Sequence, residues 1–280
     1  MELNEITKLV DKVYPDQINL KSFNFKKQLN PKIWEDNKLK KNVRKRLIKI
    51  AKEFVKSTDI EFIPVDIVIV GSIASFNWSK YSDIDLHIIT DFKSINDNTE
   101  LVKNYLYSKK CEWNNDHRDL KIYGYDVELY AQDINEENES NGIYSVKYNH
   151  WIKIPSTKHK QLDKNTIKEI AAMYINKIEY YNRKFDELSS DKAFLLLQSK
   201  VKYLYDLIIQ GRKKSLPVEG EQATGNIIFK VLRRSGHLEM INKLKKKLFD
   251  KINSIEETYT VDDKKLITEN LTNLQTLQNI

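Results

Sequence analysis

The chain contains few of the residues that cross-link or interrupt a fold. Among its 280 residues there are one cysteine, seven glycines and five prolines. Because Cys111 is alone, an internal disulfide and a cysteine-rich zinc site are both excluded, and a reducing cytoplasm is the expected compartment. No run of 18 or more apolar residues occurs, which excludes a transmembrane helix. The acidic, interrupted N-terminus, MELNEITKLVDKVYPDQ, does not fit a secretory signal peptide.

An excess of positive charge is confined to the second half of the chain. Hydrophobic residues make up 40% of the sequence and charged residues 31%, as is typical of globular proteins. Residues 1–155 contain 24 basic and 24 acidic side chains, whereas residues 200–251 contain 13 basic and 5 acidic ones. This segregation favours a polyanionic partner, or a polyphosphate held between domains. The alternative is a lysine-rich helix surface that contacts only water.

The spacing of apolar residues divides the chain into a mixed first part and a helical second part. In the first part, helical spacing predicts helices over residues 36–58 and 97–112. Short β-branched runs predict strands in the same part, at residues 60–70, 83–89 and 120–133 and, as a hairpin, 142–155. The alternation of the strand over 120–133 changes phase at Gly124, which predicts a β-bulge there.

Beyond residue 160 the apolar residues recur with the 3.6-residue period of helices. We therefore expect an α+β protein with two domains. Residues 1–155 would form a mixed α/β catalytic domain, and residues 156–280 a basic, all-helical domain. Both would contribute to one site.

Two carboxylates lie within a segment that otherwise reads as a buried strand. Asp83 and Asp85 are two residues apart, so their side chains point to the same side of the strand. Burying two unpaired like charges is costly, so a partner must sit between them. Divalent cations together with the phosphates of a nucleotide supply such a partner, because Mg²⁺ prefers oxygen ligands. An edge strand whose aspartates face water is the alternative.

His87 is expected on the same side of this strand as the two aspartates, because it follows Asp85 by two residues. We expect its side chain to pack or to form a hydrogen bond rather than to bind metal.

A second metal position needs a third carboxylate from a neighbouring strand. Asp126 and Glu128 are the only acids inside a later strand pattern. Glu128, between Val127 and Leu129, is the first choice and Asp126 the second. The third acid would also orient or deprotonate an attacking hydroxyl group.

A glycine and a serine end the strand that precedes the paired aspartates. Gly71 and Ser72 follow the apolar run DIVIV, and exposed backbone N–H groups with a serine hydroxyl at that point suit a β- or γ-phosphate. Gly-Ser, ten intervening residues, Asp-x-Asp in an apolar strand and a later strand acid together resemble the polymerase-β-like nucleotidyltransferase superfamily. The segments NPKIWEDNKLKKNVRKRLIKIAKEF and SNGIYSVKYNHWI are similar to predicted nucleotidyltransferases of large tailed phages.

The resemblance implies a palm-type mixed sheet with flanking helices and a transfer of a nucleoside monophosphate from a nucleoside triphosphate such as ATP. Asp83, Asp85 and Glu128 would hold two Mg²⁺ ions, for which Mn²⁺ can substitute, and pyrophosphate would leave. Many bacterial members carry a basic or glycine-rich stretch after Gly-Ser. Here the stretch is IASFNW, in which Ser75 is the only polar side chain near enough to assist a phosphate.

The acceptor of the nucleotide is left open by the sequence. The basic helical half favours an RNA 3′ end such as that of tRNA, with Arg233, Arg234 and Lys245–Lys247 as candidate contacts. A small alcohol, a protein hydroxyl or a second nucleotide are alternative acceptors. Two other functions compete with catalysis: an inactive nucleotide-sensing module, and an RNA-binding protein whose binding survives loss of the acids. A bacterial or phage-infected bacterial cytoplasm is the expected location.

Overall fold

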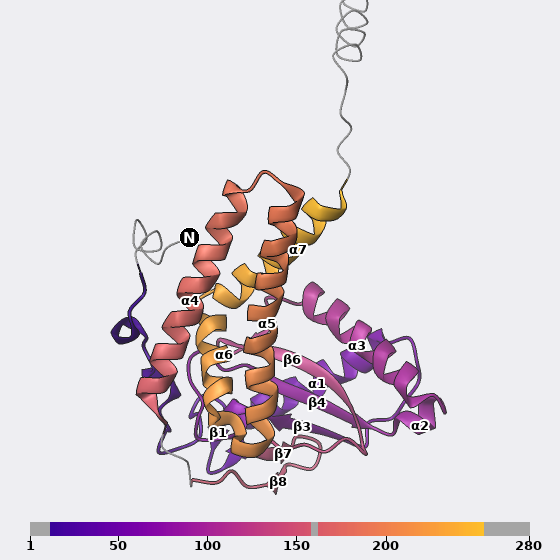
Figure 1. Ribbon diagram of the computed structural model, residues 1–280. Helices are drawn as coiled ribbons and strands as arrows, with labels where there is room; N and C mark the ends of the chain where they lie inside the picture. Colours follow the sequence, from indigo (N-terminus) through magenta and orange to yellow (C-terminus); the bar gives the residue numbers. More distant parts are fainter. Residues whose placement is uncertain (1–11, 158–161, 255–280) are drawn as a thin grey trace, which may run out of the picture.

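A mixed β-sheet carries helices on both faces, and a bundle of four long helices follows it (Figure 1). The computed structural model describes residues 12–157 and 162–254. The sheet has six strands in the order β5-β6-β4-β3-β7-β8. Its strands are β3 (Asp66–Val70), β4 (Ile84–Thr90), β5 (Lys121–Ile122), β6 (Tyr125–Asp133), β7 (Ile143–Ser145) and β8 (His150–Lys153). The α+β class predicted from the sequence is confirmed.

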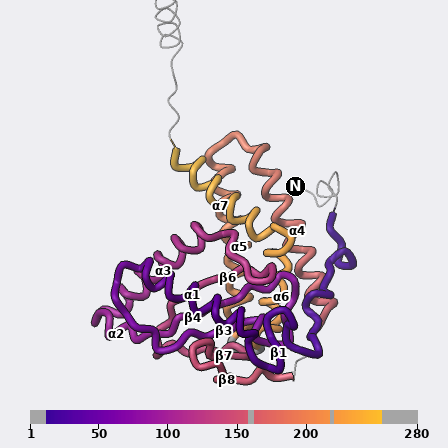
Figure 2. The backbone as a smooth tube through the Cα atoms, turned by 180° about the vertical axis from the view of Figure 1, so that it is seen from behind, coloured from indigo at the N-terminus to yellow at the C-terminus, as the bar shows by residue number. Residues whose placement is uncertain are grey.

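Three helices and a small hairpin complete the first part of the chain. The hairpin consists of β1 (Trp34–Glu35) and β2 (Lys38–Leu39), and the helices are α1 (Lys41–Ser57), α2 (Phe92–Ile95) and α3 (Thr99–Asp116). The helical part consists of α4 (Lys164–Glu187), α5 (Asp191–Glu219), α6 (Thr224–Arg234) and α7 (His237–Asn253). Seen from behind, α1 covers one face of β3 and β4, while α5 and α6 lie on the opposite face (Figures 1 and 2). None of the described helices is long and apolar enough to span a membrane.

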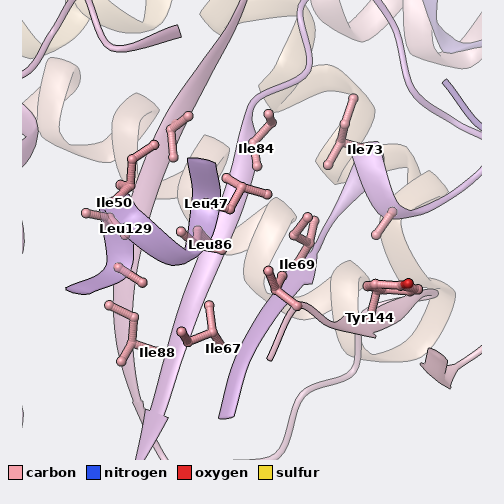
Figure 3. Close-up of a cluster of buried hydrophobic side chains, with 14 of the residues drawn as sticks. Leu47, Ile50, Ile67, Ile69, Ile73, Ile84, Leu86, Ile88, Leu129 and Tyr144 are labelled. Atoms are coloured by element: carbon pink, nitrogen blue, oxygen red, sulfur yellow. The ribbon is translucent and has the colours of Figure 1, made fainter. Parts of the chain in front are cut away.

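The central strand β4 alternates strictly between the two faces of the sheet. Ile84, Leu86 and Ile88 are fully buried, whereas Asp85 and His87 are partly exposed. Figure 3 shows the three apolar side chains in the cluster that also contains residues of α1. Burial of their apolar surface fixes the register, because a slip of one residue would drive the charged side chains into the core. The core therefore forces Asp85 onto the face that α5 and α6 approach.

Two predicted segments differ from the structure. The strand over 120–133 is a tight hairpin and not one bulged strand: β5 and β6 pair antiparallel, with Ile122 opposite Tyr125. Tyr123 and Gly124 both have positive φ, 52° and 88°, as two-residue hairpin turns of type I′ require. The phase change at Gly124 thus marks a turn. The first helix starts at Lys41 and not at residue 36, because the preceding residues form the β1–β2 hairpin, which ends at Leu39.

The buried apolar residues form two clusters. One lies between the sheet and its helices α1 and α3, and the other between α4, α5, α6 and α7. Ile18, Leu20 and Phe23 belong to the second cluster although they precede the sheet in the chain. The amide of Asn176 on α4 holds this segment by bonding both the N–H and the carbonyl of Val13, each at 2.9 Å. The N-terminal segment thus connects the helical part to the side of the sheet.

Candidate active site

The end of β3 and the start of β4 bring the glycine–serine pair against the paired aspartates. Val70 pairs with Asp85 in the antiparallel ladder, so Gly71 comes directly beside that carboxylate. A Cβ atom built at Gly71 would lie 2.2 Å from Oδ2 of Asp85, and φ at Gly71 is +72°. Both facts exclude a side chain at position 71. Only glycine adopts this positive φ without strain, and only glycine leaves room for the Asp85 carboxylate. The glycine lets the Asp85 carboxylate approach the turn.

A cleft of about 430 Å³ lies between the helical part and the end of the sheet at which β3 ends and β4 begins. Gly71, Ser72, Asp83, Asp85 and Glu128 line its sheet side. The structure thus brings together five of the six residues singled out in the sequence, from three separate chain segments.

The parallel pairing of β4 and β6 gives the two candidates for the third acid different surroundings. Glu128 lies opposite Asp85 in the register and lines the cleft. Asp126 also affects the electrostatics of Asp83, but it does not line the cleft and forms an ion pair with Lys121 of β5. A carboxylate that is already neutralised by a lysine is the weaker metal ligand. The geometry therefore favours Glu128.

Ser75 does not lie where a phosphate could reach it. The side chain is fully buried and does not line the cleft, so the expectation of a direct phosphate contact is corrected. Its hydroxyl donates to Oδ1 of Asn77, and Nδ2 of Asn77 donates to Oε2 of Glu221 at 2.6 Å. Glu221 lies in the short turn between α5 and α6 and lines the cleft. Ser75 thus positions Asn77, which joins the sheet to the helical part.

The hydroxyl of Ser72 is oriented by a short chain of hydrogen bonds. The backbone N–H of Ser79 donates to Oγ of Ser82 at 3.0 Å, and Oγ of Ser82 lies 2.8 Å from Oγ of Ser72. When Ser82 donates its proton to Ser72, the proton of Ser72 is left to point into the cleft. A hydroxyl held in this way suits an anionic oxygen.

Cationic side chains of the helical part face the acids across the cleft. Arg212 of α5 and Lys230 and Arg233 of α6 line it, and Nη2 of Arg233 lies 3.7 Å from Oδ2 of Asp83. Among the described residues, neither Arg212 nor Lys230 has a carboxylate within ion-pair distance. Burial lowers the pKa of Lys230, against the opposing effect of Glu221, and burial lowers the pKa of Arg212. Partly buried cations without a carboxylate partner are costly, and an anion in the cleft would offset that cost.

Of these cations, only Arg233 was singled out from the sequence. The charge count placed Arg212 and Lys230 in the basic segment 200–251 but did not distinguish them from its other basic residues. One signal was present: Lys230 is the only charged residue between Ile227 and Leu232, within an otherwise apolar stretch of α6. A charge at a buried helical position is the pattern of a functional residue.

The acids perturb one another's protonation. Burial, followed by the Glu128 and Asp83 carboxylates, raises the pKa of Asp85 to about 7. Burial and Glu128 also raise the pKa of Asp83, while Arg233 lowers it. Carboxylates that converge in a cleft repel one another when ionised, so they do not all lose their protons until a cation binds between them. The donor set consists of carboxylate oxygens, which suits a hard cation such as Mg²⁺.

The carboxylates do not form a ready-made three-ligand metal site. Among the described residues, no group of three or more His, Cys, Asp or Glu side chains stands close enough to hold a metal ion. Mg²⁺ commonly takes only one or two carboxylates and completes its shell with phosphate oxygens and water. The geometry fits a metal that enters with a triphosphate, rather than one held by protein ligands alone.

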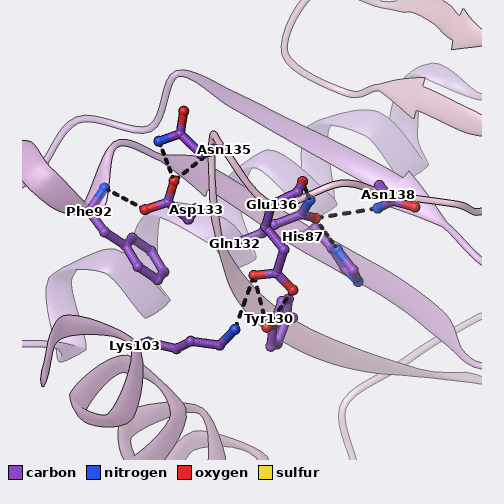
Figure 4. Close-up of polar contacts among 9 residues, drawn as sticks. All are labelled: His87, Phe92, Lys103, Tyr130, Gln132, Asp133, Asn135, Glu136 and Asn138. Carbon is purple, nitrogen blue, oxygen red and sulfur yellow. Dashed lines mark hydrogen bonds and ion pairs between the residues drawn. The ribbon is translucent and has the colours of Figure 1, made fainter. Parts of the chain in front are cut away.

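His87 lies on the same side of β4 as Asp85 but belongs to a separate polar network (Figure 4). Its Nδ1 lies 2.7 Å from Oε1 of Gln132, and Nε2 of Gln132 donates to the carbonyl of Glu136 at 2.8 Å. Because the amide nitrogen of Gln132 is used there, its oxygen must accept, and His87 donates from Nδ1. Burial lowers the pKa of His87. The hydrogen-bonded role expected from the sequence is what the structure shows.

A comparison with protein families agrees with this geometry. Residues 44–171 match the model described as nucleotidyltransferase domain. Residues 44–171 form a nucleotidyltransferase domain. The match is of the polymerase-β-like type and spans all the sheet-side residues of the cleft. This nucleotidyltransferase domain implies transfer of a nucleoside monophosphate from a nucleoside triphosphate. Searches of curated proteins and of solved structures returned no significant match.

Proposed function

We propose that the protein is a Mg²⁺-dependent nucleotidyltransferase that transfers a nucleoside monophosphate to an RNA 3′ end, such as that of tRNA. One observation carries the catalytic part: three carboxylates on the sheet line the same cleft as cations on α5 and α6 that have no carboxylate partner within the described residues. A metal-bound triphosphate would join them, because its metals meet the acids and its phosphates meet the cations. The two domains, residues 1–155 and 156–280, would each supply one half of this arrangement.

Each residue of the cleft would have a distinct task. Asp83 and Asp85 would hold two Mg²⁺ ions together with Glu128. When bound, these ions supply charge neutralisation of the triphosphate and acidify the acceptor hydroxyl. Glu128, the most exposed of the three, would accept or direct the proton of that hydroxyl. Gly71 and Ser72 would bind the phosphates by backbone N–H groups and by the hydroxyl.

Lys230 and Arg212 would neutralise the leaving pyrophosphate. Both side chains are already positioned in the cleft, so little reorganisation accompanies the reaction. Most of the rate enhancement would come from in-line positioning and from this charge compensation. The closer resemblance to nucleotidyltransferases of large tailed phages, and the choice of ATP among nucleotides, are parts of the proposal that rest on sequence resemblance alone.

The RNA part of the proposal rests on the basic helical part. The structure separates the five basic residues singled out in the sequence: Arg233 and Arg234 line the cleft, whereas Lys245–Lys247 lie on α7. Nζ of Lys245 lies 3.5 Å from the ring centre of Tyr205, and Nζ of Lys247 lies 5.8 Å from that of Phe185. Lysines interleaved with aromatic rings suit a single strand, because phosphates contact the amines and bases stack on rings.

The proposal is tested by incubating the protein with each α-³²P-labelled nucleoside triphosphate, Mg²⁺ and total RNA. The expected result is a label on one RNA class that disappears when Asp83 is replaced by Ala. Label on a small molecule or protein would replace the RNA acceptor, and absence of transfer to every acceptor tried would favour an inactive sensing module.

The contribution of α7 is measured separately. Replacing Lys245–Lys247 by Gln should weaken RNA binding and flatten its dependence on salt, because each phosphate neutralised adds to the salt slope. The control replaces the exposed Lys45, Arg46 and Lys49 of α1, on the opposite face of the sheet. An unchanged slope in the α7 variant would contradict an RNA contact there.

A further inference from the structure

A second, smaller groove adjoins the cleft. It has a volume of about 400 Å³ and lies between the N-terminal segment 17–23, residues 80–81 and the end of α6. Phe23, Tyr81 and Arg234 line both the groove and the cleft. The groove therefore opens next to the reacting centre, and nothing in the proposed chemistry uses it.

As far as the structure describes the chain, the groove is lined by basic residues and by no acid. Lys21, Lys80 and Arg234 line it, and no Asp or Glu is among its lining residues. In the described part of the chain, none of these three cations has a carboxylate within ion-pair distance. A concave surface with three cations and no acid attracts anions, and its walls concentrate the field.

Arg234 is fixed in the wall between the two spaces. Its guanidinium carbon lies 4.1 Å from the ring centre of Phe23 and 4.8 Å from that of Tyr81. Nη1 donates to Oγ of Ser22 at 2.7 Å, and Nη2 reaches Oγ of Ser79 at 3.5 Å. Two rings and two hydroxyls thus hold a cation that meets no carboxylate. This is a preorganised wall for an anionic ligand.

The groove adjoins the cleft on the side of Asp83. Gly71, which we assign to the triphosphate, packs against Asp85. Tyr81 precedes Asp83 by two residues. Arg234 follows Arg233, whose side chain contacts Asp83. Tyr81 is 45% exposed, and Nζ of Lys80 lies 4.9 Å from its ring centre. A ring with a cation beside it can take a stacked base while the cation meets the adjoining phosphate.

We propose that this groove binds a phosphate-bearing nucleotide unit of the acceptor, with Lys21 and Lys80 on the phosphate and Tyr81 beneath the base. The assignment of the groove to the acceptor rests on the proposed function, but the binding itself does not require turnover. The shared chemistry is a nucleotide phosphate, which either an RNA 3′ end or a free mononucleotide presents.

The test measures binding in the presence of Mg²⁺ and a saturating α,β-methylene nucleoside triphosphate, which occupies the cleft and prevents transfer. Three probes are titrated: a trinucleotide RNA, a nucleoside 5′-monophosphate and the same nucleoside without phosphate. The double variant Lys21→Gln, Lys80→Gln should weaken binding of the phosphate-bearing probes about tenfold and leave the nucleoside unchanged. Both lysines are exposed, so the fold should be retained. The control is Lys27→Gln, Lys93→Gln, two exposed lysines that do not line the groove.

The outcomes distinguish the ligand source and the two proposals. A loss confined to the trinucleotide identifies RNA, and a loss for the mononucleotide as well identifies any nucleotide phosphate; both support the groove. Tyr81→Leu should weaken the same probes, whereas Tyr81→Phe, which keeps the ring, should not. Equal affinity in wild type and the double variant overturns the inference, as does a loss of affinity for the triphosphate analogue instead. If transfer is never observed but the groove variants lose the trinucleotide, the catalytic proposal fails while the groove stands.

Discussion

Replacing Asp85 by Asn should stabilise the metal-free protein above pH 7. Burial and the neighbouring acids raise the pKa of Asp85 from 3.8 to about 7 in the folded state. The folded state therefore holds this proton more tightly than the unfolded chain does. The resulting stabilisation is complete below about pH 4 and is lost as the pH rises towards 7.

The magnitude follows from the size of that change. One pKa unit corresponds to about 1.4 kcal/mol, so ionised Asp85 lowers the free energy of unfolding by at most about 4 kcal/mol above pH 7. Asn carries no charge at any pH and escapes this penalty. Because Asp83 and Glu128 still repel each other in the variant, we expect a gain of about 1 to 4 kcal/mol at pH 8 and about a quarter of that gain at pH 4.5.

The assay is urea unfolding in EDTA at both pH values, with the exposed Glu61→Gln as a control for removal of a charge outside the cleft. A variant that is less stable than wild type at pH 8 would refute the reasoning. So would an equal gain at both pH values, because the gain would then come from packing and not from relief of charge.

Three further predictions concern the same cleft. Mg²⁺ with a nucleoside triphosphate should raise the melting temperature more than the sum of their separate effects, and additive shifts in a thermal scan would argue against a shared site. Glu128→Gln should lower turnover by orders of magnitude with little change in nucleotide affinity, whereas Asp126→Asn should do less; steady-state kinetics showing the reverse would make Asp126 the third acid. Gly71→Ala should cost about 1 to 3 kcal/mol in urea unfolding and abolish transfer, because its Cβ would meet Oδ2 of Asp85 at 2.2 Å; an active, stable variant would contradict the close approach.

The residues whose roles depend on local pattern could be predicted from the sequence. Asp83 and Asp85 share a side because side chains alternate along an extended chain, and the apolar residues that alternate with Asp85 along β4 fix which side. Gly71 marks a turn that no other residue could make at that contact. Both inferences need only a few consecutive residues.

Features that depend on long-range pairing could be ranked or only partly read in this way. The sequence placed Glu128 before Asp126, but the register between β4 and β6 and the lysine partner that the β5–β6 hairpin gives Asp126 could not be predicted from it. The phase change at Gly124 was a local sign of irregularity, but a positive φ at Tyr123 is unusual for that residue, so a bulge was the simpler interpretation. The cations of the cleft come from helices far along the chain from the acids, and Arg212 and Lys230 were visible in the sequence only as part of the summed charge.

The central claim is that the acids of the sheet and the cations of α6 together bind one metal-bound triphosphate. The most direct measurement is release of pyrophosphate, together with transfer of an α-³²P label to an acceptor, by wild type, Asp83→Ala and Lys230→Gln. Wild type should release pyrophosphate only with Mg²⁺, Asp83→Ala should release none, and Lys230→Gln should need at least about tenfold more nucleotide. Near-wild-type release by Asp83→Ala would contradict it.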